Sequence, residues 1–208
     1  MPFVDREDAG RRLARSLRRY EGDPGAIVVA LPRGGVVTGR VVADALKLPL
    51  DIVVPRKIGA EADPEYAIGA VTEEGDAVWN ERERRGAGRA YLDSTLAKER
   101  AEARRRLGTY RAGMPPRSLR GKTVLVVDDG VATGYTMRAA VATVKRCGAS
   151  RIVVAVPVCP ADSLAALELE ADEVVALESP VIFSSIGAFY DAFAQTDDAT
   201  VVRLLRHP

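Results

Sequence analysis

Residues 124–136 read VLVVDDGVATGYT, and this stretch carries the strongest structural signal in the chain. Its four leading apolar residues are typical of a strand buried on both faces of a parallel sheet. Asp128 and Asp129 follow where that strand ends, and a Thr-Gly-Tyr-Thr turn then runs into a helical pattern. Because backbone N–H groups at the start of a helix attract anions, the stretch places two carboxylates beside an anion site.

One ligand satisfies both halves of this stretch. Gly134 permits a phosphate to approach the backbone closely, and the hydroxyls of Thr133 and Thr136 add donors. Asp128 and Asp129 would repel the same phosphate, so we expect them to face sugar hydroxyls or water around a metal ion. A ribose 5-phosphate meets both demands. The alternative is a solvated Asp-Asp-Gly turn and a simple helix cap, which the length of the whole run disfavours.

The rest of the chain alternates apolar runs with helical patterns, which predicts an α/β fold with a parallel sheet. An N-terminal helix capped by Asp5 is expected to reach about Tyr20, with Leu13 and Leu17 on one face. The predicted strands are residues 27–31, 50–55, 123–129, 151–158 and 172–177, and the predicted helices between them include 36–46 and 136–147.

The pattern favours a single domain over residues 1–208. We expect an arginine-rich helical insertion at about 81–118 and a hood or cap formed by about 172–208 with the N-terminal helix. Residues 58–75 are rich in glycine, proline and acids. This composition fits either a lid that closes over a ligand or an ordinary β-hairpin, and both stay open.

Two further strand exits carry groups suited to phosphate. After the first strand, Gly34 and Gly35 can turn backbone amides toward a ligand, and Arg33 offers a planar fork for phosphate oxygens. After the second strand, Lys57 adds another cation. Ligands of open parallel sheets collect at the carboxyl ends of the strands, so we expect these groups to meet the acid pair. A tight turn at the glycines and a solvated charge at Lys57 are the alternatives.

Composition excludes several classes of function. Lys and Arg number 30 against 29 for Asp and Glu, so no overall field favours nucleic acid or an anionic membrane. Cys147 and Cys159 lack metal-ligand spacing and His207 is the single histidine, so we expect no structural zinc. The N-terminus has no leader pattern, and no apolar run approaches the ~18 residues of a membrane span. A cytoplasmic protein with free thiols is expected.

The opening stretch resembles the phosphoribosyl-pyrophosphate (PRPP) signature of type I phosphoribosyltransferases: four apolar residues, two acids, a short spacer and Thr-Gly-x-Thr. LPRGGV, RKIGA…PEYAIGAV and SIGAFYDAF are also similar to a bacterial branch of proteins with this domain. The resemblance implies a Rossmann-like parallel five-stranded sheet flanked by helices, with a small hood. It implies that Asp128 and Asp129 hold the ribose 2′- and 3′-hydroxyls. The other PRPP-binding residues implied are Gly130, Ala132, Thr133, Gly134, Tyr135 and Thr136 on the phosphate side, and Arg33, Gly34, Gly35 and Lys57 on the pyrophosphate side.

The function implied is the transfer of a phosphoribosyl group from PRPP to a nucleobase-like acceptor, with release of pyrophosphate. Asp128, Asp129, Arg33 and Lys57 are the implied catalytic residues. Departure of pyrophosphate builds positive charge on the ring and negative charge on the leaving group, which these side chains can stabilise. Mg²⁺ is the expected cofactor, carried by PRPP and reaching Asp128 and Asp129 through water, without a dedicated protein site.

The acceptor is less defined. Ala132 stands where 6-oxopurine phosphoribosyltransferases usually carry an aspartate, which disfavours hypoxanthine or guanine transfer by the usual proton route. In the aromatic C-terminal stretch, Phe183 or Tyr190 can stack a base while Asp191 reads its edge. Core packing of the same aromatic rings is the alternative.

Other functions stay open. A PRPP-sensing regulator without turnover would need a nucleic-acid-binding module, and an enzyme of the PRPP-synthetase kind would need a second, ATP-binding domain; neither is evident. Arginines 104–106 are interleaved with Glu99 and Glu102, which favours a solvated helix face over an RNA site. The expected partners are PRPP and a small acceptor, with no nucleic acid and no membrane, and a homodimer stays open.

Overall fold

The computed structural model describes residues 2–75 and 77–206, and its centre is a parallel sheet with strand order β2-β1-β6-β7-β8. Ala30 at the end of β1 lies opposite Ile52 on β2 and Val127 on β6, so these three strands end at the same level. The loops that follow them therefore meet at one edge of the sheet. The strands are β1 (Ala26–Ala30), β2 (Leu50–Ile52), β6 (Thr123–Val127), β7 (Arg151–Val158) and β8 (Glu173–Glu178).

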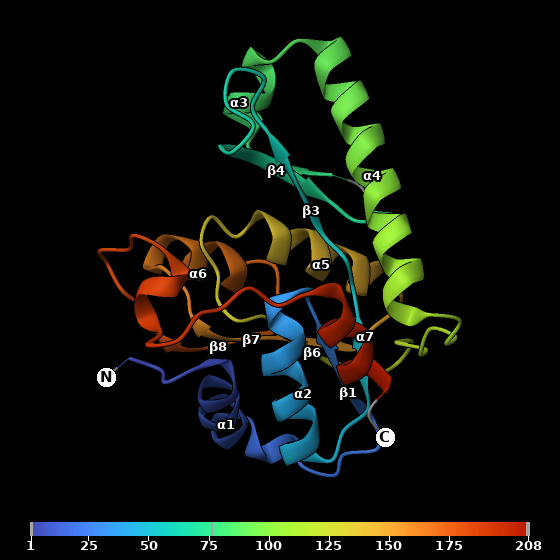
Figure 1. Ribbon diagram of the computed structural model, residues 1–208, viewed down its shortest axis with the longest axis vertical. Helices are drawn as coiled ribbons and strands as arrows, with labels where there is room; N and C mark the ends of the chain where they lie inside the picture. Colours follow the sequence, from blue (N-terminus) through green and yellow to red (C-terminus); the bar gives the residue numbers. More distant parts are fainter. Residues whose placement is uncertain (1, 76, 207–208) are drawn as a thin grey trace.

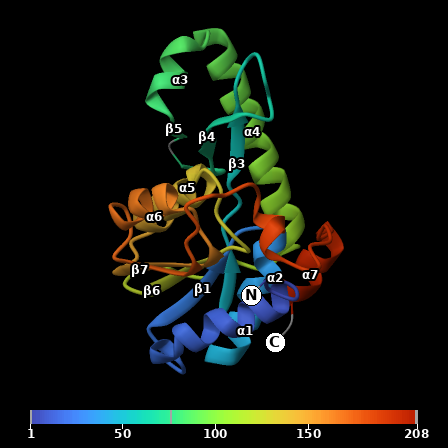
Figure 2. The ribbon, with the colours of Figure 1, turned by 90° about the vertical axis from the view of Figure 1, so that its left-hand side faces the viewer.

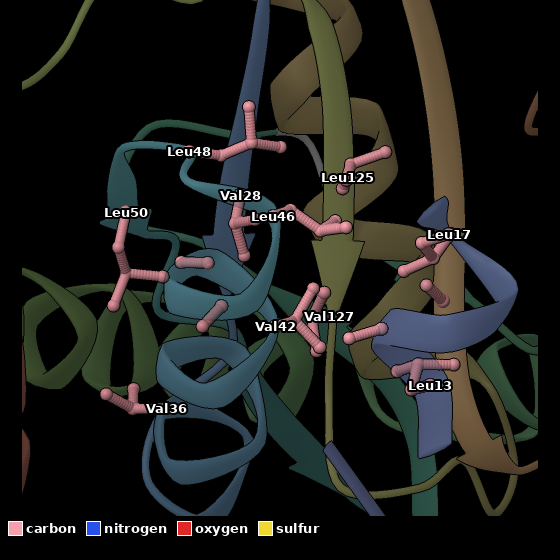
Figure 3. Packing of buried hydrophobic residues seen from close by; sticks show 14 of the residues in the cluster. Leu13, Leu17, Val28, Val36, Val42, Leu46, Leu48, Leu50, Leu125 and Val127 are labelled. Carbon is pink, nitrogen blue, oxygen red and sulfur yellow. The ribbon is translucent and has the colours of Figure 1, made fainter. Parts of the chain in front are cut away.

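Helices cover both faces of the sheet (Figure 1). One core cluster joins the sheet to α1 (Arg6–Ser16), α2 (Gly34–Leu46) and α7 (Asp198–Arg206). The other joins it to α5 (Tyr135–Arg146) and α6 (Ala161–Glu168). Figure 3 shows the first cluster, in which Leu13 of α1, Leu17 just after it and Val42 of α2 pack toward the strands. Each such side chain, once buried, stabilises the fold by roughly 1.5–3 kcal/mol.

A second, antiparallel sheet stands over the central layer beside a long helix (Figures 1 and 2). We call these elements the hood: β3 (Arg56–Gly59), β4 (Ala67–Val71), β5 (Val78–Trp79), α3 (Glu81–Gly86) and α4 (Arg89–Arg111). Ile58, Ile68 and Val71 form its own small core, against which α4 packs. A buried hydrogen bond of 2.8 Å between the hydroxyls of Thr72 and Thr143 ties the hood to α5.

The predicted fold class, a parallel five-stranded α/β sheet with helices and a small hood, is confirmed. Asp5 caps α1 by accepting a hydrogen bond of 2.7 Å from the Asp8 backbone N–H, as expected. That helix ends earlier than predicted, and a 3₁₀ turn, η1 (Arg18–Tyr20), follows it. The second strand ends at Ile52 instead of residue 55 because the chain there turns up into the hood. Residues 58–75 contain the β3–β4 hairpin, whose closure as a lid stays a prediction.

The segments expected to form the cap divide between two places. Residues 173–178 belong to the central sheet as its edge strand β8, and the hood is built by residues between 56 and 111 instead. The remainder of the C-terminal region, with the 3₁₀ turn η2 (Ile186–Phe189), does pair with the N-terminus. Phe3 N–H donates to the Phe189 carbonyl, and Asp191 N–H donates to the Phe3 carbonyl, both over 2.8 Å.

Within residues 2–75 and 77–206, no helix combines the length and apolar character that crossing a membrane would require. The arginine-rich part of α4 is paired with acid: Arg105 and Arg106 both donate to Glu102 over 2.7 Å. These hydrogen bonds lower the pKa of Glu102 to about 2. The predicted solvated, charge-paired helix face is therefore present here.

Candidate active site

A cavity of about 620 Å³ lies between the hood and the loops that follow β1, β2 and β6. It brings together the three strand exits that the sequence analysis predicted to meet. Gly35 and Tyr135, which were also predicted to bind PRPP, are not among its lining residues. The predicted residues that do line it are Arg33, Gly34, Lys57, Asp128, Asp129, Gly130, Ala132, Thr133, Gly134 and Thr136.

The phosphate turn has the geometry of an anion site. Gly134 is the residue before α5 and has φ of 79°, a left-handed conformation that side chains with a Cβ rarely adopt. The first N–H groups of a helix have no partner inside it, and no side chain of the described residues caps α5. Ser163 holds the turn in place by donating to the Ala132 carbonyl over 2.6 Å. The backbone donors of this turn are thus open to an anion in the cavity.

The acid pair is enclosed by the protein. Asp129 is 8% exposed, and its backbone N–H donates to Asp128 Oδ1 over 2.8 Å. Desolvation and then the charge of Asp129 raise the pKa of Asp128 well above its ordinary value. Two enclosed like charges repel each other, and positive charge that develops nearby relieves this repulsion.

Gly34 and Gly35, at the start of α2, lie so close to the acid pair that a side chain would not fit at either position. A Cβ on Gly34 would overlap Asp129 Oδ2, and a Cβ on Gly35 would lie 2.5 Å from Asp128 Oδ1. Both contacts are too close for a real side chain. The loop after β1 and the loop after β6 therefore fit together only because neither glycine carries a side chain.

Arg6, at the first position of α1, is a site residue that the sequence analysis missed. Its Nε donates to Asp129 Oδ2 over 2.6 Å, and both side chains are 12% exposed. Its Nη1 donates to the Ala194 carbonyl over 2.6 Å, and its guanidinium carbon lies 3.8 Å from the centre of the Phe193 ring. No local pattern marks Arg6, because its partner is 123 residues away and α1 has several other arginines.

Two cations occupy the predicted pyrophosphate end. Arg33 follows β1, and its Nη1 lies 3.6 Å from Asp198 Oδ1 at the start of α7. The hydroxyl of Tyr110 donates to the same Asp198 oxygen over 2.9 Å, which links α4 to this corner. Lys57, on β3, is exposed and lines the same cavity. Both cations line the cavity, Arg33 from the loop after β1 and Lys57 from β3, and two cations suit a doubly charged group.

The hood contributes a wall of the cavity, and its α4 part was not predicted by the sequence analysis. The helix α4 supplies Tyr91, Thr95, Lys98, Glu99 and Arg106, and the β3–β4 loop supplies Pro64 and Glu65. Spacings of three, four and seven residues put such side chains on one face of a helix. That spacing is visible in the sequence, but nothing in it indicates which face of α4 turns toward the sheet.

The three predicted base-binding residues are not among those lining the cavity. Tyr190 is 7% exposed, packs on Phe3, and donates through its hydroxyl to the Asp129 carbonyl over 2.6 Å. Phe183 stacks on Phe189 with ring centres 5.9 Å apart, and Asp191 is exposed. The structure gives Tyr190 the packing role that was the alternative, and a base-binding role for the three stays a prediction.

Groups able to form a dedicated metal site are scarce. Among the described residues there is no cluster of three or more His, Cys, Asp or Glu side chains suited to a metal ion. Cys147 and Cys159 are free thiols, and His207 lies outside the described residues. The two carboxylates at the end of β6 remain the hard oxygen ligands that a hydrated Mg²⁺ ion prefers.

Comparisons with known proteins point to one family. Residues 4–190 match the family model described as "Phosphoribosyl transferase domain". Two Mycobacterium tuberculosis proteins, from strains CDC 1551 and H37Rv, each carry the name "putative phosphoribosyl transferase". Each is 42% identical to this chain over 205 residues, which is 98% of this chain and 46% of the relative. The chain thus spans about half the length of these curated relatives.

Solved structures share the fold. TT1426 from Thermus thermophilus has a TM-score of 0.82 and 42% sequence identity, over 99% of this chain and 98% of TT1426. The AQ2163 protein from Aquifex aeolicus has a TM-score of 0.50 and 10% identity, over 82% of this chain and 73% of that one, and shows likeness of fold alone.

Proposed function

The chain belongs to the phosphoribosyl transferase domain family, and we propose that it transfers a 5-phosphoribosyl group from PRPP to a nucleobase-like acceptor with release of pyrophosphate. One observation carries the proposal. An enclosed acid pair, an open helix start and the cations Arg33 and Lys57 line the same cavity of about 620 Å³. A sugar that carries a phosphate at one end and a pyrophosphate at the other has this distribution of charge and hydroxyl groups.

The proposed binding mode follows from the positions of these groups. The 5′-phosphate lies at the start of α5, where the N–H groups after Gly134 and the hydroxyls of Thr133 and Thr136 donate to it. The ribose hydroxyls donate to Asp128 and Asp129. The pyrophosphate lies between Arg33 and Lys57.

The proposed role of the protein in catalysis is electrostatic. As the bond from the ribose C1 to pyrophosphate breaks, the ring gains positive charge and the leaving group gains negative charge. Asp128 and Asp129 stabilise the ring, and Arg33 and Lys57 stabilise the departing pyrophosphate. The hood shields the reacting ribose C1 from water, which would otherwise attack it and hydrolyse PRPP.

Mg²⁺ is the proposed cofactor. The donor set fits an ion carried on PRPP, since Asp128 and Asp129 offer oxygen ligands but too few for a cage built by the protein alone. Bound in this way, the ion would neutralise phosphate charge. The free thiols support the proposed cytoplasmic location.

The acceptor is proposed to enter from the hood side. Ala132 lines the cavity and offers no side chain for proton transfer, which supports an acceptor outside the 6-oxopurine class. The hood wall of the cavity is mostly polar and charged: Thr95, Lys98, Glu99 and Glu65 line it beside Tyr91 and Pro64. Hydrogen-bonding edges of a heterocycle or a similar polar acceptor suit such a wall better than an apolar ring does.

An assay of pyrophosphate release tests the function. The purified protein is incubated with PRPP, Mg²⁺ and single nucleobases, and pyrophosphate is measured against reactions without a base or without protein. The expected result is release that depends on one base or a small group of related bases. Tight PRPP binding by calorimetry without release for any acceptor would instead support the alternative, a PRPP-sensing regulator.

A further inference from the structure

We propose that Arg6 is a positioning residue of the PRPP site, which fixes one oxygen of Asp129 and leaves the other for a ribose hydroxyl. The inference rests on the proposed function, because it assigns a task within that site. It places the N-terminal helix among the elements that shape the site, although α1 packs mainly on the far side of the sheet from the hood (Figure 1).

The two oxygens of Asp129 have different surroundings. Oδ2 accepts from Arg6 Nε over 2.6 Å and lies against the backbone of Gly34, where even a Cβ would overlap it. The hydrogen bond from Arg6 is to Oδ2 and leaves Oδ1, and Asp129 lines the cavity. Because one oxygen is held and crowded, the carboxylate has one orientation, and Oδ1 is its available acceptor.

Arg6 is itself held by two contacts besides Asp129. Its Nη1 donates to the Ala194 carbonyl over 2.6 Å, and the Phe193 ring covers its guanidinium at 3.8 Å. The hydroxyl of Tyr190 fixes the main chain of Asp129 from the same side, over 2.6 Å. A planar guanidinium anchored in this way has little freedom, so it can hold the orientation of its partner.

Arg6 also supplies charge where the site needs it. Asp128 and Asp129 are adjacent and enclosed, so their two charges repel each other when no ligand is bound. An arginine that cannot lose its proton offsets this repulsion. Arg6 pairs with Asp129, whereas Asp128 Oδ1 accepts from the Asp129 backbone N–H, so the two carboxylates are not equivalent.

A double-mutant cycle tests this role by measuring PRPP affinity with Mg²⁺ present, using calorimetry. The proteins are wild type, Arg6→Gln, Asp129→Asn and the double variant. If Arg6 acts through Asp129, Arg6→Gln weakens PRPP binding at least about tenfold in the wild-type background. In the Asp129→Asn background the same change alters affinity less than about twofold, because the partner charge is already gone.

Two further variants separate positioning from packing. Arg6→Lys keeps the charge but loses the planar fork, so it should recover part of the lost affinity. Arg12→Gln is the matched control: Arg12 also lies on α1, pairs with Asp8 over 2.7 Å and covers the Phe3 ring at 5.2 Å, outside the cavity. Its PRPP affinity should stay within about twofold of wild type.

The outcomes of these experiments either support or overturn the positioning role of Arg6. Equal losses from Arg6→Gln in both backgrounds would assign Arg6 to packing alone and overturn the proposal, and so would unchanged affinity in a folded Arg6→Gln protein. If Arg6→Gln does not fold by thermal melting, the same cycle with Arg6→Lys applies. Wild-type protein that does not bind PRPP at all would overturn the proposed function together with this role.

Discussion

The two walls of the cavity consist of different kinds of chemical groups. The sheet wall consists of backbone groups, glycines and short acids at the ends of β1 and β6, packed so closely that a Cβ on Gly34 would overlap a carboxylate. The hood wall consists of side chains from α4 and the β3–β4 loop, of which Lys98 and Glu65 are exposed. Backbone donors and enclosed carboxylates cannot adapt, whereas exposed side chains can. The sheet wall is thus suited to one invariant ligand part, and the hood wall to the part that distinguishes acceptors.

Replacing the acid pair should show the largest effect of any change to the sheet wall. Asp128→Asn with Asp129→Asn keeps the size and a hydrogen-bond acceptor but removes the negative charge that the ring needs in the transition state. Turnover should fall on the order of 100- to 1000-fold, whereas PRPP affinity falls far less. Pyrophosphate release and calorimetry, both with a competent acceptor, measure the two quantities. A double variant with wild-type turnover would defeat the assignment of this wall.

Gly134→Val tests the phosphate turn. Its φ of 79° disfavours a β-branched residue, and the new side chain would lie where the phosphate is expected. Affinity for both PRPP and ribose 5-phosphate should fall at least about 100-fold, or about 2.7 kcal/mol.

Gly113→Val is the matched control for Gly134→Val, since Gly113 has φ of 87° and open space around it, outside the cavity. It should carry the same backbone strain and bind both ligands normally. Unchanged affinity in a folded Gly134→Val protein would remove this turn from the site.

Arg33→Ala distinguishes the two ends of the ligand. The guanidinium is assigned to pyrophosphate alone, so PRPP affinity should fall by roughly 1.5–3 kcal/mol while ribose 5-phosphate affinity changes little. Calorimetry with both ligands gives the comparison, and Arg203→Ala, an exposed position on α7, serves as the control. Equal losses of affinity for both ligands would contradict the assignment of Arg33 to the pyrophosphate end of PRPP.

Lys98→Ala should have the smallest effect on PRPP and so tests the hood wall. Lys98 lines the cavity from α4 and is exposed. PRPP affinity should stay within about threefold of wild type, since the charge is exposed and screened. The change should appear instead in the KM for the acceptor. A loss of PRPP affinity as large as that of Arg33→Ala would contradict the assignment of PRPP to the sheet wall and of the acceptor to the hood wall.

The sequence predictions were more accurate for the sheet wall of the cavity than for the hood wall. The strand, the acids and the turn of residues 124–136 are contiguous, so local patterns were sufficient to place them in one site. Lys57 was expected beyond the second strand of the main sheet, and it lies instead on β3 of the hood, still within the cavity. The α4 part of the hood wall was not predicted, because the apolar residues Leu92, Leu96 and Leu107 mark the face of α4 that packs on the cores and not the polar face that lines the cavity.

By itself the sequence determined the alternation of strands and helices, the parallel sheet and the residues of the phosphate turn, because each depends on neighbours in the chain. Only the tertiary structure decided that Arg6 meets Asp129 across 123 residues and that α4 faces the sheet wall. It also decided that Tyr190 is a buried support for the acid loop. Such contacts depend on how whole elements pack, and a helix or a loop carries no local mark of the distant surface that it will meet.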